Sequence, residues 1–115
     1  TMSLEEKFAS LSMDDVSSIV DSIKADGVVK AGLPESIVAL TAKCASKTEA
    51  EALAGLKVVK DLAENVPTAQ PFIKDALGAC LEQASSKSTP VQEAAKETAY
   101  AICDNICPFA MKALM

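Results

Sequence analysis

One short pattern occurs three times in the chain at equal spacing. Proline followed after four residues by Ala-Leu is found from Pro34 to Leu40, from Pro71 to Leu77 and from Pro108 to Leu114, so each copy begins 37 residues after the one before. A fixed period of this length is typical of a chain that stacks repeated units. A closed up-and-down helical bundle would explain amphipathic helices but not the equal spacing, so we favour a stack over a bundle.

Each repeat contains signals for two helices. Ser3 with Glu6 and Thr48 with Glu51 have the form of a capping box, in which a hydroxyl and a carboxylate satisfy free N–H groups at a helix start. Thr89-Pro90 places proline at a first helical position, where its missing N–H costs nothing. These signals predict helices that begin near residues 4, 49 and 90.

Apolar residues recur at spacings of three and four after these starts, which predicts helices with one buried face. The two clearest stripes are Ala52, Leu56, Val59, Ala63 and Val66, and then Val91, Ala95, Thr98, Ile102 and Ile106. Similar patterns cover Asp14 to Lys24, Pro34 to Ala45 and Pro71 to Ala84, where Phe72, Ile73, Ala76, Leu77, Cys80 and Leu81 are the apolar positions. No segment is a convincing strand, and Gly27 to Lys30 is better interpreted as a connection between helices.

The pattern as a whole predicts an all-α fold, a solenoid of helical hairpins of the HEAT type with about six to seven helices. We expect one domain over residues 1–115, with repeats at roughly 33–66 and 69–107 and a partial repeat from 108. Thr1 precedes Met2 and is interpreted as a residue left by cloning. The apolar pattern after Pro108 stops at Met115, so we expect the chain to be the N-terminal part of a larger protein.

Composition excludes most kinds of active site. The 115 residues contain no His, all eleven basic residues are Lys, and the net charge is −5. No His-based base or mixed Cys/His zinc site can form, and no Gly-x4-Gly-Lys-Ser/Thr loop is present to hold a nucleotide. We therefore expect no catalytic residue, no metal and no cofactor in this chain, and a small stand-alone enzyme is the weakest functional hypothesis.

Two further features concern the compartment. No apolar run approaches the roughly 20 residues of a membrane span, and Met2 to Lys24 has neither the apolar core of a signal peptide nor the composition of a transit peptide. We expect no membrane association and a cytoplasmic location.

Three stretches resemble a known family. Gln70 to Cys80, Val91 to Ala99 and Ile106 to Leu114 are similar to the N-terminal HEAT region of the translation elongation factor 3 family, and Leu4 to Leu11, Leu33 to Glu35 and Thr48 to Val66 fit the same region. Ribosome-associated general-control HEAT proteins carry a related stretch. The resemblance implies a cytoplasmic, ribosome-associated factor in which this region is a scaffold and ATP is hydrolysed in later domains that this chain lacks.

Four polar residues are the candidates for partner contact. Lys57 and Lys60 lie on the outward face of their predicted helix, which they share with Asp61 and Glu64, so a solvated face laced with salt bridges is the simpler interpretation. Lys96 and Tyr100, the only Tyr, lie opposite the apolar stripe of the last long helix. An exposed Tyr can be a contact residue, although single exposed aromatic residues are common.

The four cysteines are the remaining candidates. Cys44, Cys80 and Cys103 lie on or beside apolar stripes, where a free thiol behaves as a small apolar side chain, so we favour a packing role over metal binding. Cys107 lies nearer the polar face, and we expect it to be the most reactive thiol.

Two functional hypotheses remain open at this point. The first is a noncatalytic scaffold of an elongation-factor-3-like ribosome-associated ATPase, which contacts ribosomal protein or RNA. The second is a HEAT protein-interaction module of another pathway, such as translational control, transport, the cytoskeleton or a phosphatase. The acidic charge predicts negligible binding of free RNA by the isolated chain under either hypothesis.

Overall fold

The computed structural model describes residues 4–106 and consists of helices and turns, with no strand in that range. The α-helices are α1 (Leu4–Ala9), α2 (Val16–Asp26), α3 (Val28–Ala31), α4 (Leu33–Cys44), α5 (Glu49–Asn65), α6 (Gln70–Ile73), α7 (Leu77–Gln83) and α8 (Thr89–Ile106). Short 3-10 turns lie at Met13–Asp15, Pro67–Ala69 and Lys74–Ala76. The all-α class predicted from the sequence is confirmed. The partial repeat expected from residue 108 lies outside the described residues.

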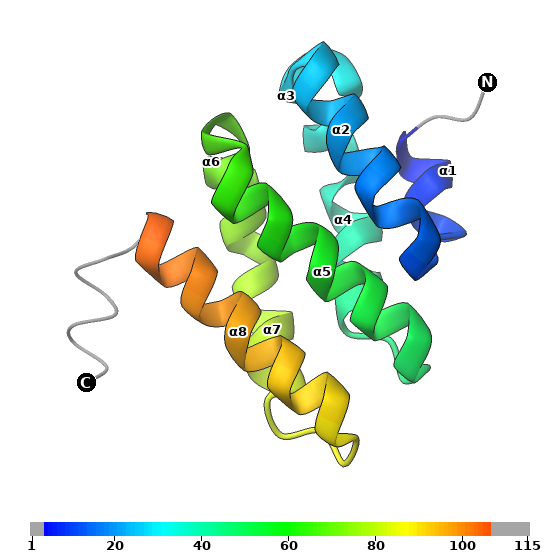
Figure 1. Ribbon diagram of the computed structural model, residues 1–115, viewed down its shortest axis with the longest axis vertical. Coiled ribbons are helices and arrows are strands. Elements are labelled where there is room, and N and C mark those ends of the chain that lie inside the picture. Colours follow the sequence, from blue (N-terminus) through cyan, green and yellow to red (C-terminus); the bar gives the residue numbers. More distant parts are fainter. Residues whose placement is uncertain (1–3, 107–115) are drawn as a thin grey trace.

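The helices form two layers. In Figure 1, α2, α5 and α8 lie side by side and run in the same direction, while α1, α4 and α7 lie behind them. Within each layer α5 packs between α2 and α8, and α4 packs between α1 and the segment from α6 to α7. Consecutive hairpins therefore stack along one axis, which gives an elongated molecule of 43 × 30 × 19 Å. This arrangement is the solenoid that the period predicts.

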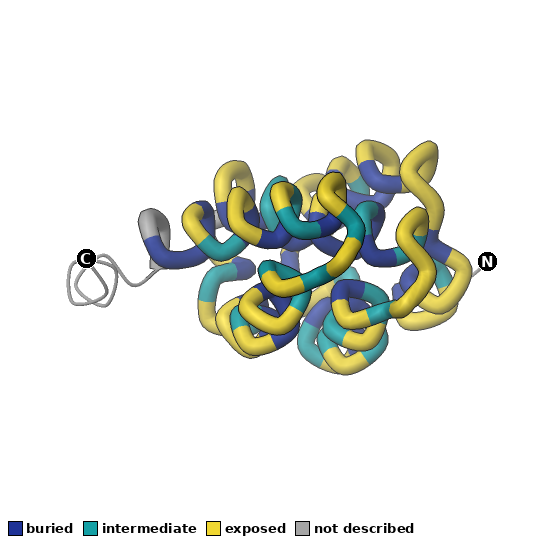
Figure 2. Tube along the Cα trace, turned by 90° about the horizontal axis from the view of Figure 1, so that it is seen from below, coloured by how far each residue is buried: buried dark blue, intermediate teal, exposed yellow. Residues whose placement is uncertain are grey.

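The core lies between the two layers. Figure 2 shows buried residues on the inner sides of the helices and exposed residues on their outer sides. Both predicted stripes are buried wherever their side chains are described: Ala52, Leu56, Val59, Ala63, Val66, Val91, Ala95, Thr98 and Ile102. The side chain of Ile106 lies outside the described part. None of the helices within residues 4–106 is long and apolar enough to cross a membrane.

The segment predicted as one helix over Pro71 to Ala84 is interrupted. It consists of α6, the 3-10 turn Lys74–Ala76 and α7. Ile73, Ala76 and Cys80 are fully buried, whereas Leu81, placed in the apolar pattern by the sequence, is 56% exposed. Successive residues on a helix point about 100° apart, so the orientation that buries Cys80 directs Leu81 into solvent.

Two glycines separate α2, α3 and α4. Gly27 and Gly32 have φ angles of 92° and 89°, a region that glycine adopts without the steric cost that other residues meet. The chain ends α2 at Gly27, makes the single helical turn of α3 and turns again at Gly32 before α4. The interpretation of Gly27 to Lys30 as a connection between longer helices is consistent with this path.

The turn from α4 to α5 differs from the predicted capping box. Thr48 is the N-terminal cap of α5, but its side chain makes no capping hydrogen bond. Ser46 Oγ accepts a hydrogen bond from the backbone N–H of Thr48 at 3.1 Å and donates one to Glu51 Oε2 at 2.8 Å. Glu51 Oε1 accepts from Lys43 Nζ at 2.8 Å. The capping motif correctly predicted the residue at which α5 begins. However, Lys43 and Ser46 donate hydrogen bonds to the Glu51 carboxylate, which the capping box would have used.

Candidate interaction surface

The four predicted contact residues lie on α5 and α8, the two long helices of the layer formed by α2, α5 and α8. Lys57 Nζ lies 3.7 Å from Asp61 Oδ2, one turn along α5, and Lys60 Nζ lies 3.5 Å from Glu97 Oε2 on α8. Lys96 is exposed, and Tyr100 is 59% exposed. The Lys57–Asp61 pair belongs to the salt-bridged face predicted from the sequence, whereas the Lys60–Glu97 pair joins α5 to α8 and was not predicted. The expectation that a partner binds these four residues stays a prediction.

A groove of about 170 Å³ lies between the outer sides of α5 and α8. Its lining comes from both helices and from the turn before α2: Met13, Leu53, Lys57, Lys60, Ala94, Glu97 and Thr98. The structure therefore brings Lys57 and Lys60 together at one groove. Lys96 and Tyr100 lie on α8 but do not line it.

Thr98 holds α8 against α5 beneath this groove. Its hydroxyl is buried and lies 2.7 Å from the carbonyl oxygen of Ala94, one turn earlier on α8, and 3.1 Å from that of Leu56 on α5. The second contact joins neighbouring hairpins. A polar side chain in an apolar stripe needs such acceptors, because an unsatisfied buried hydroxyl is costly.

Of the residues that line the groove, the sequence predicts only Lys57 and Lys60 as contact residues. Leu53 and Ala94 are half-buried, and Met13 is 47% exposed. The ion pair between Lys60 and Glu97 depends on the register between α5 and α8, which no local sequence pattern predicts. The signal available was the apolar Leu53, one turn before Lys57 and two turns before Lys60 on the same side of the helix.

A second pocket of about 230 Å³ lies between neighbouring hairpins, at the turn from α4 to α5 and the turn from α7 to α8. Gln83 lines it and donates hydrogen bonds from Nε2 to the carbonyl oxygens of Cys44 at 2.8 Å and Ser46 at 2.9 Å. Ser88 Oγ is buried there without a hydrogen-bond partner. The geometry of Gln83 shows a structural role, since its amide satisfies carbonyls at the end of α4.

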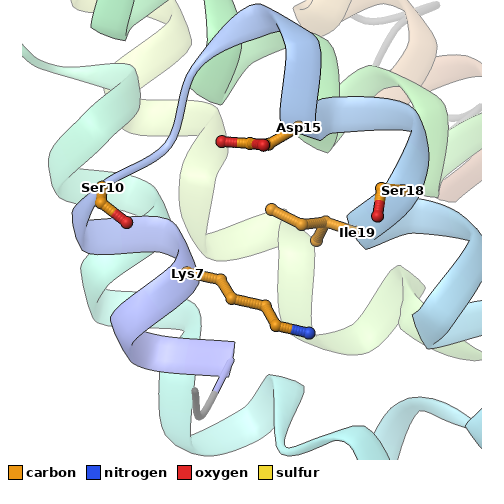
Figure 3. A pocket seen from close by; sticks show the side chains of 5 residues that line it. All are labelled: Lys7, Ser10, Asp15, Ser18 and Ile19. Carbon is orange, nitrogen blue, oxygen red and sulfur yellow. The ribbon is translucent and has the colours of Figure 1, made fainter. Parts of the chain in front are cut away.

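A third pocket of about 200 Å³ lies between α1 and α2 (Figure 3). Lys7 extends across it from α1, while Asp15 and Ile19 approach it from the other side. Ser10 and Ser18 complete the lining, and Asp15 accepts a hydrogen bond from Ser12 Oγ at 3.0 Å. One positive and one negative side chain leave this pocket with no net charge, so its lining favours neither anions nor cations.

The described cysteines belong to the core. Cys44 and Cys80 are fully buried and Cys103 is 5% exposed. Burial raises the pKa of the Cys80 thiol to about 12 and raises the pKa of Cys44 further above its ordinary value, with the neighbouring Cys80 adding to the effect. Both thiols are therefore protonated at neutral pH and pack as small apolar groups, in line with the expected packing role. Cys107 lies outside the described residues.

Metal binding finds no support in the described part of the chain. Between residues 4 and 106 there is no cluster of three or more His, Cys, Asp or Glu side chains that could hold a metal ion.

Comparisons with known proteins place the chain in a family. A family model described as the EF3 N-terminal HEAT repeat matches residues 13–115. Elongation factor 3 from Zygosaccharomyces rouxii is 29% identical over 104 residues, which cover 89% of this chain and 10% of that protein. The chain thus spans about a tenth of the length of this relative, and no solved structure matches it. Because the family model covers most of the chain, the protein belongs to the elongation factor 3 N-terminal HEAT repeat family.

Proposed function

We propose that this chain is a noncatalytic scaffold of an elongation-factor-3-like, ribosome-associated ATPase that acts in translation elongation in the cytoplasm. The match to the EF3 N-terminal HEAT repeat over residues 13–115 carries this proposal. The relative's name, elongation factor 3, supplies the link to translation.

The structure supports a scaffold rather than a reaction centre. Its hairpins stack so that α2, α5 and α8 lie side by side in one layer (Figure 1). The polar side chains at the α5 and α8 groove are engaged in ion pairs. Stacked helical repeats commonly use such extended surfaces for binding.

The first test of the proposal is the sequence of the gene that encodes this chain. We expect the reading frame beyond Met115 to encode more helical repeats followed by two Walker A motifs, Gly-x4-Gly-Lys-Ser/Thr, each able to hold a nucleotide phosphate. A parent protein without such motifs would contradict the ATPase part of the proposal.

Ribosome co-sedimentation tests the scaffold itself. In the parent protein, deletion of residues 4–106 should reduce sedimentation with ribosomes while basal ATP hydrolysis is retained. Several weak patches acting together can give strong overall binding, so the isolated chain should contribute only part of it. Unchanged ribosome binding after the deletion would contradict the proposed role.

Binding to naked RNA provides a third test. With a net charge of −5 and no Arg, the isolated chain should show negligible affinity for RNA at physiological salt, because such binding depends on neutralising phosphates. Tight binding of the isolated chain to bare RNA would contradict this electrostatic argument.

A further inference from the structure

We draw no further inference here: the strongest candidate, the apolar surface of α4 and α7 on which Val38 is 77% and Leu81 is 56% exposed, carries none because nothing in residues 4–106 shows what covers it.

Discussion

A β-carbon added to Gly55 would lie 2.8 Å from the backbone nitrogen of Cys44. Helices α4 and α5 therefore approach so closely in their hairpin that no side chain fits between them at this point. Other atoms of α4 are almost as near, since the same β-carbon would lie 3.0 Å from the carbonyl carbon of Lys43. Because backbone atoms cannot move aside as the end of a flexible side chain can, Gly55 fixes the distance between the two layers.

Gly55→Ala should destabilise the protein. Alanine favours a helix by about 0.5–1 kcal/mol over glycine, but forcing extra volume into a packed contact costs about 1–3 kcal/mol, so the net change should lower the free energy of unfolding. Gly78→Ala is the matched control, because a β-carbon there meets nothing within 4 Å. Urea denaturation should show opposite signs for the two variants, and stabilisation by both would contradict the close approach.

Gln83 should be required for the contact between α7 and the turn that ends α4. Gln83→Ala removes the donor to the carbonyls of Cys44 and Ser46 and should cost about 1–2 kcal/mol. Gln83→Glu should cost more at pH 7, since a carboxylate can only accept, and part of the loss should be recovered at low pH when it is protonated.

Thermal unfolding at pH 7 and at low pH measures this difference. Glu82→Gln, an exposed neighbour, is the control and should change stability by less than about 0.5 kcal/mol. A Gln83→Glu variant that is as stable as the original protein at pH 7 would contradict the assigned hydrogen bonds.

Thr98→Val should weaken the contact between α5 and α8. The substitution keeps the shape of the side chain but removes a buried hydroxyl that lies within hydrogen-bond distance of Leu56 and Ala94 carbonyls, at a cost of about 0.5–1.5 kcal/mol. Thr41→Val is the control, because the Thr41 hydroxyl donates only to the carbonyl of Ile37 on its own helix at 2.8 Å. Chemical denaturation should show the larger loss for Thr98→Val, and equal losses would mean that the contact across hairpins contributes nothing.

Truncation of buried apolar side chains should destabilise the protein more than truncation of an exposed one. Leu56→Ala and Ile102→Ala remove side chains that are fully buried and should each destabilise the protein by about 2–5 kcal/mol. Leu81→Ala removes a side chain that is 56% exposed and should cost less than about 1 kcal/mol. A loss below about 0.5 kcal/mol at Leu56 or Ile102 would show that its helix face is assigned wrongly.

The sequence predicts the parts of this fold that depend on periodicity. The stripes from Ala52 to Val66 and from Val91 to Ile102 are buried as expected, because a helix that packs on one side must repeat its apolar residues every three or four positions. The stacking of similar hairpins follows from the equal spacing of the Pro-x4-Ala-Leu pattern.

The parts of the fold that depend on contacts between hairpins could not be predicted from the sequence. Gln83 reaches the α4 turn, and Lys60 reaches Glu97, only because of the register between helices that are far apart along the chain. The helix over Pro71 to Ala84 is interrupted by the 3-10 turn Lys74–Ala76, and the orientation of α7 that buries Cys80 leaves Leu81 exposed. Gly55 did carry a local signal, since a glycine inside a strongly helical stretch usually has a packing reason.

Glu51 should give the protein a stability contribution that depends on pH. Hydrogen bonds from Lys43 and Ser46, together with the Lys43 charge, hold the pKa of Glu51 below its ordinary value of 4.5. Because the folded state lowers this pKa, the contribution is complete above the ordinary pKa and is lost as the pH falls through the folded value.

Lys43→Met tests this linkage. The variant should raise the pKa of Glu51 in the folded protein towards 4.5, measured by NMR titration of its carboxyl carbon. Its melting temperature should fall more at pH 7 than at pH 3, because at pH 3 Glu51 is largely protonated in the unfolded chain and in the variant. Lys47→Met provides the control, since Lys47 is exposed and the ion pair of Glu51 is made by Lys43. An unchanged Glu51 pKa in Lys43→Met, or equal melting-temperature losses at the two pH values, would show that the pair at the start of α5 does not couple folding to protonation.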